Sequence, residues 1–122
     1  NGLNGSGQIV AIADTGIDYD MCFFHDPECP VPVNTVNMKH RKIIVYRPLP
    51  PGSELSSDTS HGTHTAGSIA GEASYSDPSV VQAISVINGM AFRSKLAVYD
   101  LGPKQQIRIP GNLYEDLFEI VA

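Results

Sequence analysis

The chain has 122 residues, of which 42% are hydrophobic and 17% are charged, and its formal net charge at pH 7 is −5. This length suits one ordinary domain that buries about two-thirds of its unfolded surface. The acidic balance argues against a nucleic-acid-binding surface or a polybasic membrane patch, and no apolar run approaches the ~18 residues of a transmembrane segment.

The first predicted element is a strand over residues 8–13, a continuous apolar run with β-branched side chains. Such a run is typical of a strand that is covered on both faces in a parallel sheet. The residues Asp14-Thr15-Gly16 end it, which puts an acid at the carboxyl end of the strand. Open α/β sheets place their ligand crevices at that edge.

An irregular region follows, and we interpret residues 19–57 as an insert loop that contains one short strand over residues 42–47. Cys22 and Cys29 enclose six residues and could form a disulfide in an oxidising compartment. This possibility favours a secreted or lumenal protein. His25 and His40 are expected to be surface loop residues.

Residues 58–71 predict a polar loop that runs into a helix of small residues. Asp58, Thr59 or Ser60 can cap this helix by accepting a backbone N–H, which places His61 in the first turn. The positive end of the helix dipole disfavours an imidazolium there. We therefore expect a neutral His61 that is ready to take a proton.

Three glycines recur in the same helix, at Gly62, Gly67 and Gly71. Each weakens an exposed helix by roughly 1 kcal/mol relative to alanine. Their repeated use indicates a backbone that is pressed against another part of the molecule. His64, one turn after His61, is expected to be a packed, hydrogen-bonded structural histidine.

The last third of the chain predicts a strand or helix over residues 80–87, a strand over residues 95–102 and a connection over residues 103–111. Asn112 is then expected to cap a helix in which Leu113, Leu117, Phe118 and Val121 share an apolar face that packs in the core.

Strands and helices that alternate in this way imply right-handed crossovers, so the predicted fold class is α/β with a doubly wound, mostly parallel sheet. So few strands would leave the faces and edges of the sheet open to water. We therefore expect the front part of a larger domain. The chain opens without Met and without a signal-peptide pattern, so we also expect either upstream processing or an excised piece.

An acid at the end of a strand and a histidine at the start of a helix are two of the groups that activate a hydroxyl nucleophile. Their surroundings, Ile-Ala-Asp-Thr-Gly-Ile-Asp at residues 12–18 and His-Gly-Thr-His-Thr-Ala-Gly at residues 61–67, resemble the Asp and His signatures of the subtilisin-like serine peptidases. The resemblance implies that Asp14 orients the histidine and that His61 is the general base. The long insert between them resembles that of long-insert members from eukaryotic microbes.

A third segment, residues 88–102, resembles the turn and strand that follow in the same family, with Phe92 in place of the usual proline. In the family, the segment after this strand forms an edge along which the peptide substrate lies as an added strand. The resemblance places this edge between Leu101 and Ile109, so Leu101 and Gly102 are candidate substrate-binding residues.

No Gly-Thr-Ser-Met-Ala nucleophile motif occurs in the 122 residues. The resemblance therefore implies that residues 1–122 are the N-terminal portion of the catalytic domain of a serine endopeptidase, with its serine outside this chain. The chain alone is predicted to be inactive, and its partners would be a peptide or protein substrate and the remainder of its own domain. The alternative is a non-catalytic, subtilase-derived structural or binding segment within an assembly.

No metal site is predicted and no cofactor is required by this chemistry. His61 and His64 could share a helix face, and Cys22, His25 and Cys29 have tolerable ligand spacing, but zincin motifs use histidines four residues apart with an intervening glutamate. The resemblance makes calcium possible, yet no local cluster of acidic residues marks a site for it.

Overall fold

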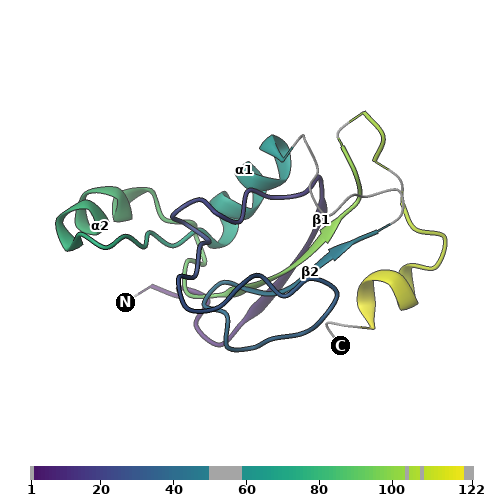
Figure 1. The fold of residues 1–122 in the computed structure, drawn as a ribbon, viewed down its shortest axis with the longest axis horizontal. Coiled ribbons are helices and arrows are strands. Elements are labelled where there is room, and N and C mark those ends of the chain that lie inside the picture. Colours follow the sequence, from purple (N-terminus) through teal and green to yellow (C-terminus); the bar gives the residue numbers. More distant parts are fainter. Residues whose placement is uncertain (1, 50–58, 104, 108, 120–122) are drawn as a thin grey trace.

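A computed structural model of the protein describes residues 2–49, 59–103, 105–107 and 109–119. Its centre is a three-stranded sheet with the strand order β1-β3-β2 (Figure 1). The strands are β1 (Ile9–Asp14), β2 (Ile43–Pro48) and β3 (Lys95–Asp100). β3 comes last in the chain but lies between the other two and pairs in parallel with both. The predicted α/β class with a parallel sheet is confirmed.

In the described part of the chain between β2 and β3 lie the helices α1 (Ser60–Ala70) and α2 (Pro78–Ile84). α1 packs on the sheet, whereas α2 continues into a short 3-10 helix (Ser85–Ile87) and lies at one end of the molecule, away from the strands (Figure 1). Residues 80–87 are therefore helical rather than a strand. No helix in the described ranges has the length and apolarity that crossing a bilayer requires.

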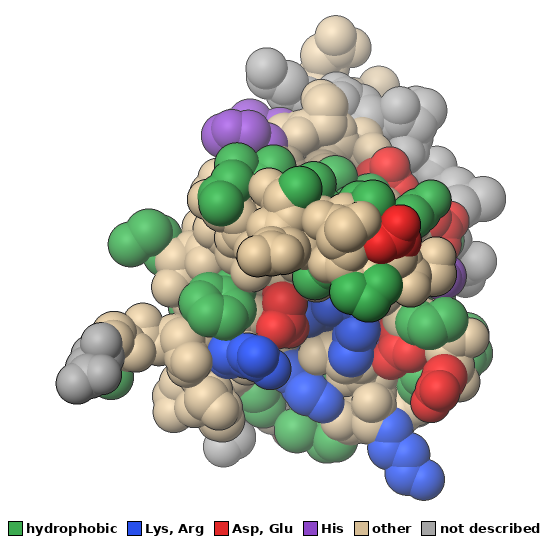
Figure 2. Space-filling model, turned by 90° about the vertical axis from the view of Figure 1, so that its left-hand side faces the viewer, with side chains coloured by type: hydrophobic (Ala, Val, Ile, Leu, Met, Phe, Trp, Pro, Cys, Tyr) green, Lys and Arg blue, Asp and Glu red, His purple; other side chains and the backbone are tan. Residues whose placement is uncertain are grey.

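The α2 end of the molecule carries several large apolar side chains on its surface, as Figure 2 shows from that side. The exposed residues of this segment include Val86, Ile87 and Met90. Below them, Lys and Arg side chains gather beside an acidic one (Figure 2). One ion pair of this end joins Arg93 Nε to Glu72 Oε1 at 3.2 Å.

The hydrophobic core lies on both faces of the sheet. On the α1 face, the small side chains of Ala66 and Ala70 let the helix approach a cluster that includes Ile12, Leu96 and Val98. On the other face, the buried residues are Ile44, Val45, Leu49, Ala97, Tyr99 and Leu101. β3 contributes to both clusters because it is the central strand and its side chains alternate between the faces.

β1 differs from its prediction. The expected strand covered on both faces would have all its apolar residues buried, but Ile9, Ala11 and Ala13 are exposed. β1 is an edge strand, and α1 covers only the face that Ile12 shares with the core. The continuous apolar run alone did not distinguish these two surroundings.

Three basic side chains hold the irregular region between β1 and α1 by bonding to backbone carbonyls; we call them the carbonyl-binding cations. Arg41 donates to the carbonyls of Cys22, His25 and Glu72. Lys42 Nζ donates to Phe92 O at 2.7 Å and Ser94 O at 2.6 Å. Lys95 Nζ donates to the carbonyls of Met38 and His40. This region is thus ordered around β2 and β3 with little regular structure of its own.

His40 was expected at the surface, and that prediction is wrong, because its side chain is fully buried. Its Nδ1 accepts the backbone N–H groups of Lys42 at 3.1 Å and Ile43 at 2.9 Å. The ring therefore organises the turn that leads into β2. His25 is exposed, as predicted.

Cys22 and Cys29 are free thiols in the structure, so the possible disulfide is not formed there. The Cys29 sulfur instead accepts a hydrogen bond from Asn37 Nδ2 at 3.2 Å and donates to Pro30 O at 3.7 Å. A bridge between the two cysteines in an oxidising compartment stays a prediction.

The C-terminal helix is wider than predicted over the residues that the structure describes. It is a π-helical turn over Tyr114–Phe118, closed by a bond from Glu119 N to Tyr114 O, and Asn112 Oδ1 accepts from Glu115 N near its start. Leu117 packs against the sheet, whereas Leu113 and Phe118 are exposed, because five-residue spacing breaks the expected four-residue stripe. Val121 lies outside the described residues.

Candidate active site

Asp14 and His61 meet at the carboxyl edge of the sheet, where β1 ends and α1 begins. His61 Nδ1 lies 2.8 Å from Asp14 Oδ1 and 2.9 Å from Oδ2. A neutral imidazole in this contact carries its proton on Nδ1, because a carboxylate only accepts. Nε2 is then the unprotonated nitrogen of a side chain that is 57% exposed. The sequence predicted that these two side chains lie together, and the structure confirms their contact.

The Asp14 carboxylate has two further donors besides His61. The backbone N–H of Thr15 donates to Oδ1 at 2.6 Å, and Thr65 Oγ1 lies 3.2 Å from Oδ2. The same Thr65 hydroxyl lies 3.1 Å from His61 O. Charge-assisted bonds of this kind hold a carboxylate in one orientation. These two donors thus fix the plane of the carboxylate that orients the His61 ring.

The start of α1 docks directly on the loop after β1. Thr15 Oγ1 accepts the backbone N–H of Gly62 at 2.8 Å, and Thr63 Oγ1 accepts that of Asp18 at 2.8 Å. A Cβ atom on Gly62 would lie 2.2 Å from Thr15 O. Only glycine lets the two backbones come this close.

The predicted helix cap is only partly right. Thr59 occupies the N-cap position, but its side chain makes no capping hydrogen bond, and Ser60 is the first residue of the helix. Asp58 lies outside the described residues. The hydroxyl of Thr15 satisfies an N–H of the first turn instead, so the cap comes from the neighbouring strand loop.

The other glycines of α1 behave differently from Gly62. A Cβ on Gly67 would meet its nearest atom, Phe24 Cζ, at 4.0 Å, which is an ordinary contact. The Cβ side of Gly67 is thus open, but its carbonyl oxygen is closely approached by another segment, since a Cβ on Gly89 would lie 2.5 Å from Gly67 O. Gly71 ends the helix, and a Cβ there would lie 2.9 Å from Gly67 O of the same helix, which is not a contact with another part of the molecule.

His64 is exposed, so the prediction of a packed structural histidine is wrong. The buried face of α1 is formed by Gly62, Ala66 and Ala70, which are four residues apart. His64 lies two residues from both Gly62 and Ala66, which turns it to the opposite side of the helix.

Leu101 and Gly102 follow β3 and lie next to Asp14. The Leu101 N–H donates to Asp14 O at 2.8 Å, and the Leu101 side chain belongs to the core. Gly102 has a φ of +98°, and its N–H donates at 2.8 Å to the buried Asp100 carboxylate, which also accepts the Tyr46 hydroxyl. The binding role of these two residues stays a prediction.

Sequence reasoning missed Thr15 and Thr65, which hold the Asp14 carboxylate and the start of α1. A signal was present, because Thr15 adjoins Asp14 and Thr65 lies one helical turn after His61. Among the described residues, no group of three or more His, Cys, Asp and Glu side chains is arranged to hold a metal ion.

Comparison with known proteins adds a family-level finding. A model of the subtilase family matches residues 5–114 of this chain. The chain is 41% identical over 119 residues to the "Serine protease/ABC transporter B family protein tagD" of Dictyostelium discoideum, and 38% identical over 117 residues to tagB of the same description and organism. Each alignment covers 96% of this chain and 6% of the relative, so the chain spans about 6% of the length of the relatives that it matches. No solved structure matches.

Proposed function

This chain belongs to the subtilase family, and on that basis we propose that Asp14 and His61 are two members of the catalytic triad of a serine endopeptidase. The single observation that carries the proposal is the contact of His61 Nδ1 with both Asp14 oxygens, at 2.8 and 2.9 Å. It is the contact between acid and base that the chemistry requires. The nucleophilic serine and the oxyanion donors would lie outside these 122 residues.

His61 Nε2 would take the proton of the serine hydroxyl as this oxygen attacks the peptide carbonyl, and would later return it to the leaving amine. Asp14 would hold the Nδ1 proton and stabilise the imidazolium that forms in between. The two further donors to Asp14, Thr15 N and Thr65 Oγ1, support this role because they keep the carboxylate from turning.

A peptide substrate would lie as an added strand along the segment that begins at Leu101 and Gly102. The bond from Leu101 N to Asp14 O supports this placement, because it puts the segment beside the candidate triad residues. The substrate-binding edge and the triad would then share the carboxyl end of one sheet. We also propose a secreted or lumenal location, based on the cysteine spacing.

The proposal is tested by labelling the full-length protein that carries this chain with a fluorophosphonate, which reacts with activated serines. We expect labelling of the wild type, loss of labelling in His61→Ala and retention in His64→Ala, the matched control one turn along α1. Labelling that persists in His61→Ala would contradict the base assignment. No labelling of a folded wild-type protein would favour the alternative, a non-catalytic structural or binding segment, which the missing serine motif motivates.

A further inference from the structure

One short segment of the chain carries the acceptor pattern for attachment of a sugar chain to an asparagine. The pattern is asparagine, any residue except proline, and then serine or threonine, and it occurs at Asn4-Gly5-Ser6. Of the six asparagines in the sequence, Asn4 alone is followed by a hydroxyl residue at that spacing. Asn1 and Asn88 also precede a glycine, so the serine is what distinguishes Asn4 from them. The proposed peptidase chemistry gives this segment no role.

The loop formed by these three residues lies on the surface, shortly before β1. Ser6 is exposed, and Asn4 is half-buried. Arg93 N donates to Asn4 O at 2.8 Å, which ties the main chain of the loop to the segment before β3. A Cβ on Gly5 would lie 2.8 Å from Ala91 Cβ, so the inner side of the loop packs on that same segment. The outer side faces solvent, which is the surface position that a bulky sugar chain requires.

The side chain of Asn4 is held by its oxygen and leaves its nitrogen unoccupied. Asn4 Oδ1 accepts the backbone N–H of Ser6 at 3.1 Å, and this bond lies in an exposed position. Asn4 Nδ2 has no hydrogen bond to any residue that the structure describes. The Ser6 hydroxyl likewise has none within the described ranges, so it contributes nothing to the folded loop. The amide nitrogen and the hydroxyl that the acceptor pattern requires are thus both free of contacts that a sugar chain would have to break.

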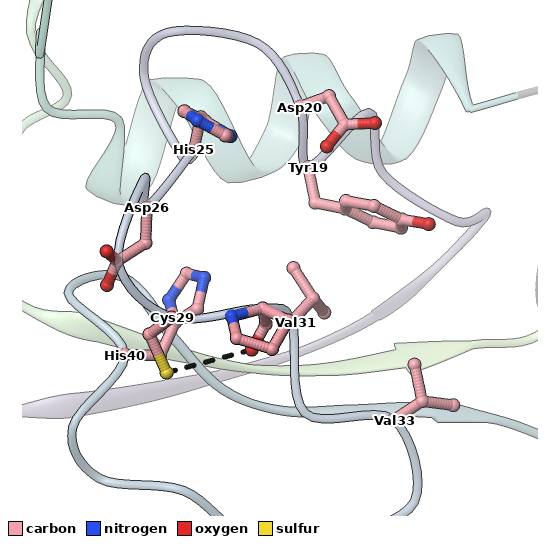
Figure 3. A pocket seen from close by; sticks show the side chains of 9 residues that line it. Tyr19, Asp20, His25, Asp26, Cys29, Val31, Val33 and His40 are labelled. Atoms are coloured by element: carbon pink, nitrogen blue, oxygen red, sulfur yellow. Dashed lines mark hydrogen bonds between the residues drawn. The ribbon is translucent and has the colours of Figure 1, made fainter.

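The loop lies at the opposite edge of the sheet from the candidate active site. It precedes the amino end of β1, whereas Asp14 and His61 meet at the carboxyl end of that strand. The six residues of β1 put its two ends about 16 Å apart, at about 3.3 Å per residue. The pocket of the irregular region, which Figure 3 shows, has its described lining between Tyr19 and His40 and includes no described residue of this loop. A sugar chain on Asn4 would therefore begin away from both places.

We propose that Asn4 carries an N-linked oligosaccharide. The donor is a lipid-linked oligosaccharyl diphosphate. The bond between Asn4 Nδ2 and C1 of the first sugar forms as the bond from C1 to the diphosphate oxygen breaks, the diphosphate leaves with the electron pair, and Nδ2 loses one proton. The Ser6 hydroxyl is needed because the transferring enzyme recognises the whole pattern. The proposal rests on the secreted or lumenal location proposed above, and not on the peptidase chemistry.

The test is a mass measurement on the full-length protein that carries this chain, produced in eukaryotic cells with its own targeting segments. The proteolytic peptide that contains Asn4 is isolated, and its mass is measured before and after treatment with peptide N-glycosidase. We expect the mass of an oligosaccharide on the wild-type peptide and its loss on treatment. Ser6→Ala should abolish the modification, and Ser6→Thr should retain it. An unmodified Asn4 in the wild-type protein would overturn the proposal.

Two controls separate glycosylation from other changes at this asparagine. Ser6→Ala removes the hydroxyl but keeps the backbone N–H that bonds to Asn4 Oδ1, so the loop should keep its conformation. Asn88-Gly89-Met90 has the same Asn-Gly pair without the hydroxyl and should carry no sugar. Deamidation of an Asn-Gly pair would survive Ser6→Ala, but it adds no sugar. A glycan on Asn4 that persists in Ser6→Ala, or one on Asn88 as well, would contradict recognition of the acceptor pattern.

The location is measured separately, as recovery of this region in the medium or its protection from added protease inside sealed vesicles. We expect one of these two results together with the glycan. A lumenal or secreted region with an unmodified Asn4 would reject the acceptor site itself, and a region open to protease on the cytosolic side would reject the location on which the proposal rests. Fluorophosphonate labelling reports on the peptidase without involving Asn4. A labelled protein with an unmodified Asn4 would therefore overturn this proposal and leave the proposed function intact.

Discussion

The Thr15 hydroxyl accepts a hydrogen bond from the Gly62 N–H at 2.8 Å across 47 residues of chain. Thr15 follows Asp14 and Gly62 follows His61, so this one bond joins the two backbones that carry the candidate catalytic pair. Thr15 is fully buried. The spacing of the acid and the base is therefore set by how β1 and α1 dock, and not by the two side chains alone.

We predict that Thr15→Val destabilises the fold by about 1–3 kcal/mol, because it leaves the Gly62 N–H buried without an acceptor. Valine has nearly the same shape, so little packing is lost. The free energy of unfolding in urea measures the effect. Thr15→Ser keeps the acceptor and should retain most of the stability. If serine were as damaging as valine, the methyl group rather than the hydroxyl would be what matters.

Gly62→Ala is expected to destabilise the protein by about 1–3 kcal/mol or more, because its Cβ would lie 2.2 Å from Thr15 O. Gly67→Ala is the matched control in the same helix, since its Cβ would only reach Phe24 Cζ at 4.0 Å. Helix propensity should make that variant neutral, or more stable by up to about 1 kcal/mol. Urea unfolding of both variants decides, and similar losses in the two would contradict the docking argument.

Thr65→Val should lower kcat of the proposed peptidase roughly tenfold with little change in KM, because it removes a donor to the Asp14 carboxylate and not a substrate contact. Thr65→Ser keeps the hydroxyl and should restore most of the activity. Steady-state kinetics on the full-length protein provide the measurement. An increase in KM with kcat intact would place Thr65 in substrate binding instead.

Stability should rise between about pH 8 and pH 10 because of Lys42. Burial lowers the pKa of Lys42 from 10.5 to about 8, although Glu72 opposes the shift. In this window the unfolded chain holds a proton that the folded chain has released, so raising the pH favours folding, by at most about 3 kcal/mol over two pH units. The neutral amine still has two N–H groups for Phe92 O and Ser94 O.

Above about pH 10 the trend should reverse, because burial raises the pKa values of Tyr46 and Tyr99 and the unfolded tyrosines ionise first. Urea unfolding at a series of pH values tests both limbs. Lys42→Met should flatten the rise, whereas the exposed Lys39→Met should keep it. A rise that survives in Lys42→Met would show that another group causes it.

The sequence predicted the parts of the fold that depend on neighbours along the chain. The run before Asp14 and the residues around Lys95 predicted two strands, and the parallel sheet followed from the order of elements. Asp14 and His61 were found because each occupies a short motif at the end of an element. Their contact could then be inferred from where parallel strands end.

Other features depend on residues far apart in sequence and left no local pattern. His40 lies in an irregular segment, and Lys95 holds its backbone from 55 residues away by donating to His40 O. His64 belongs to a helix whose buried side is selected by the close approach at Gly62. The position of Thr15 beside Asp14 was a signal for the site, but its role as a cap of α1 joins backbones 47 residues apart and could not be inferred from it.

The carbonyl-binding cations affect how the irregular region between β1 and α1 responds to salt and acid. Arg41 and Lys42 hold peptide oxygens, which bear no net charge and do not titrate in mild acid. High ionic strength weakens the attraction between exposed ions, and acid neutralises carboxylates, but neither change removes these bonds. The bonds of these cations to carbonyls should therefore persist in acid or at high salt, whereas the bond from Arg41 N to the Asp26 carboxylate and the Lys42–Glu72 ion pair should weaken.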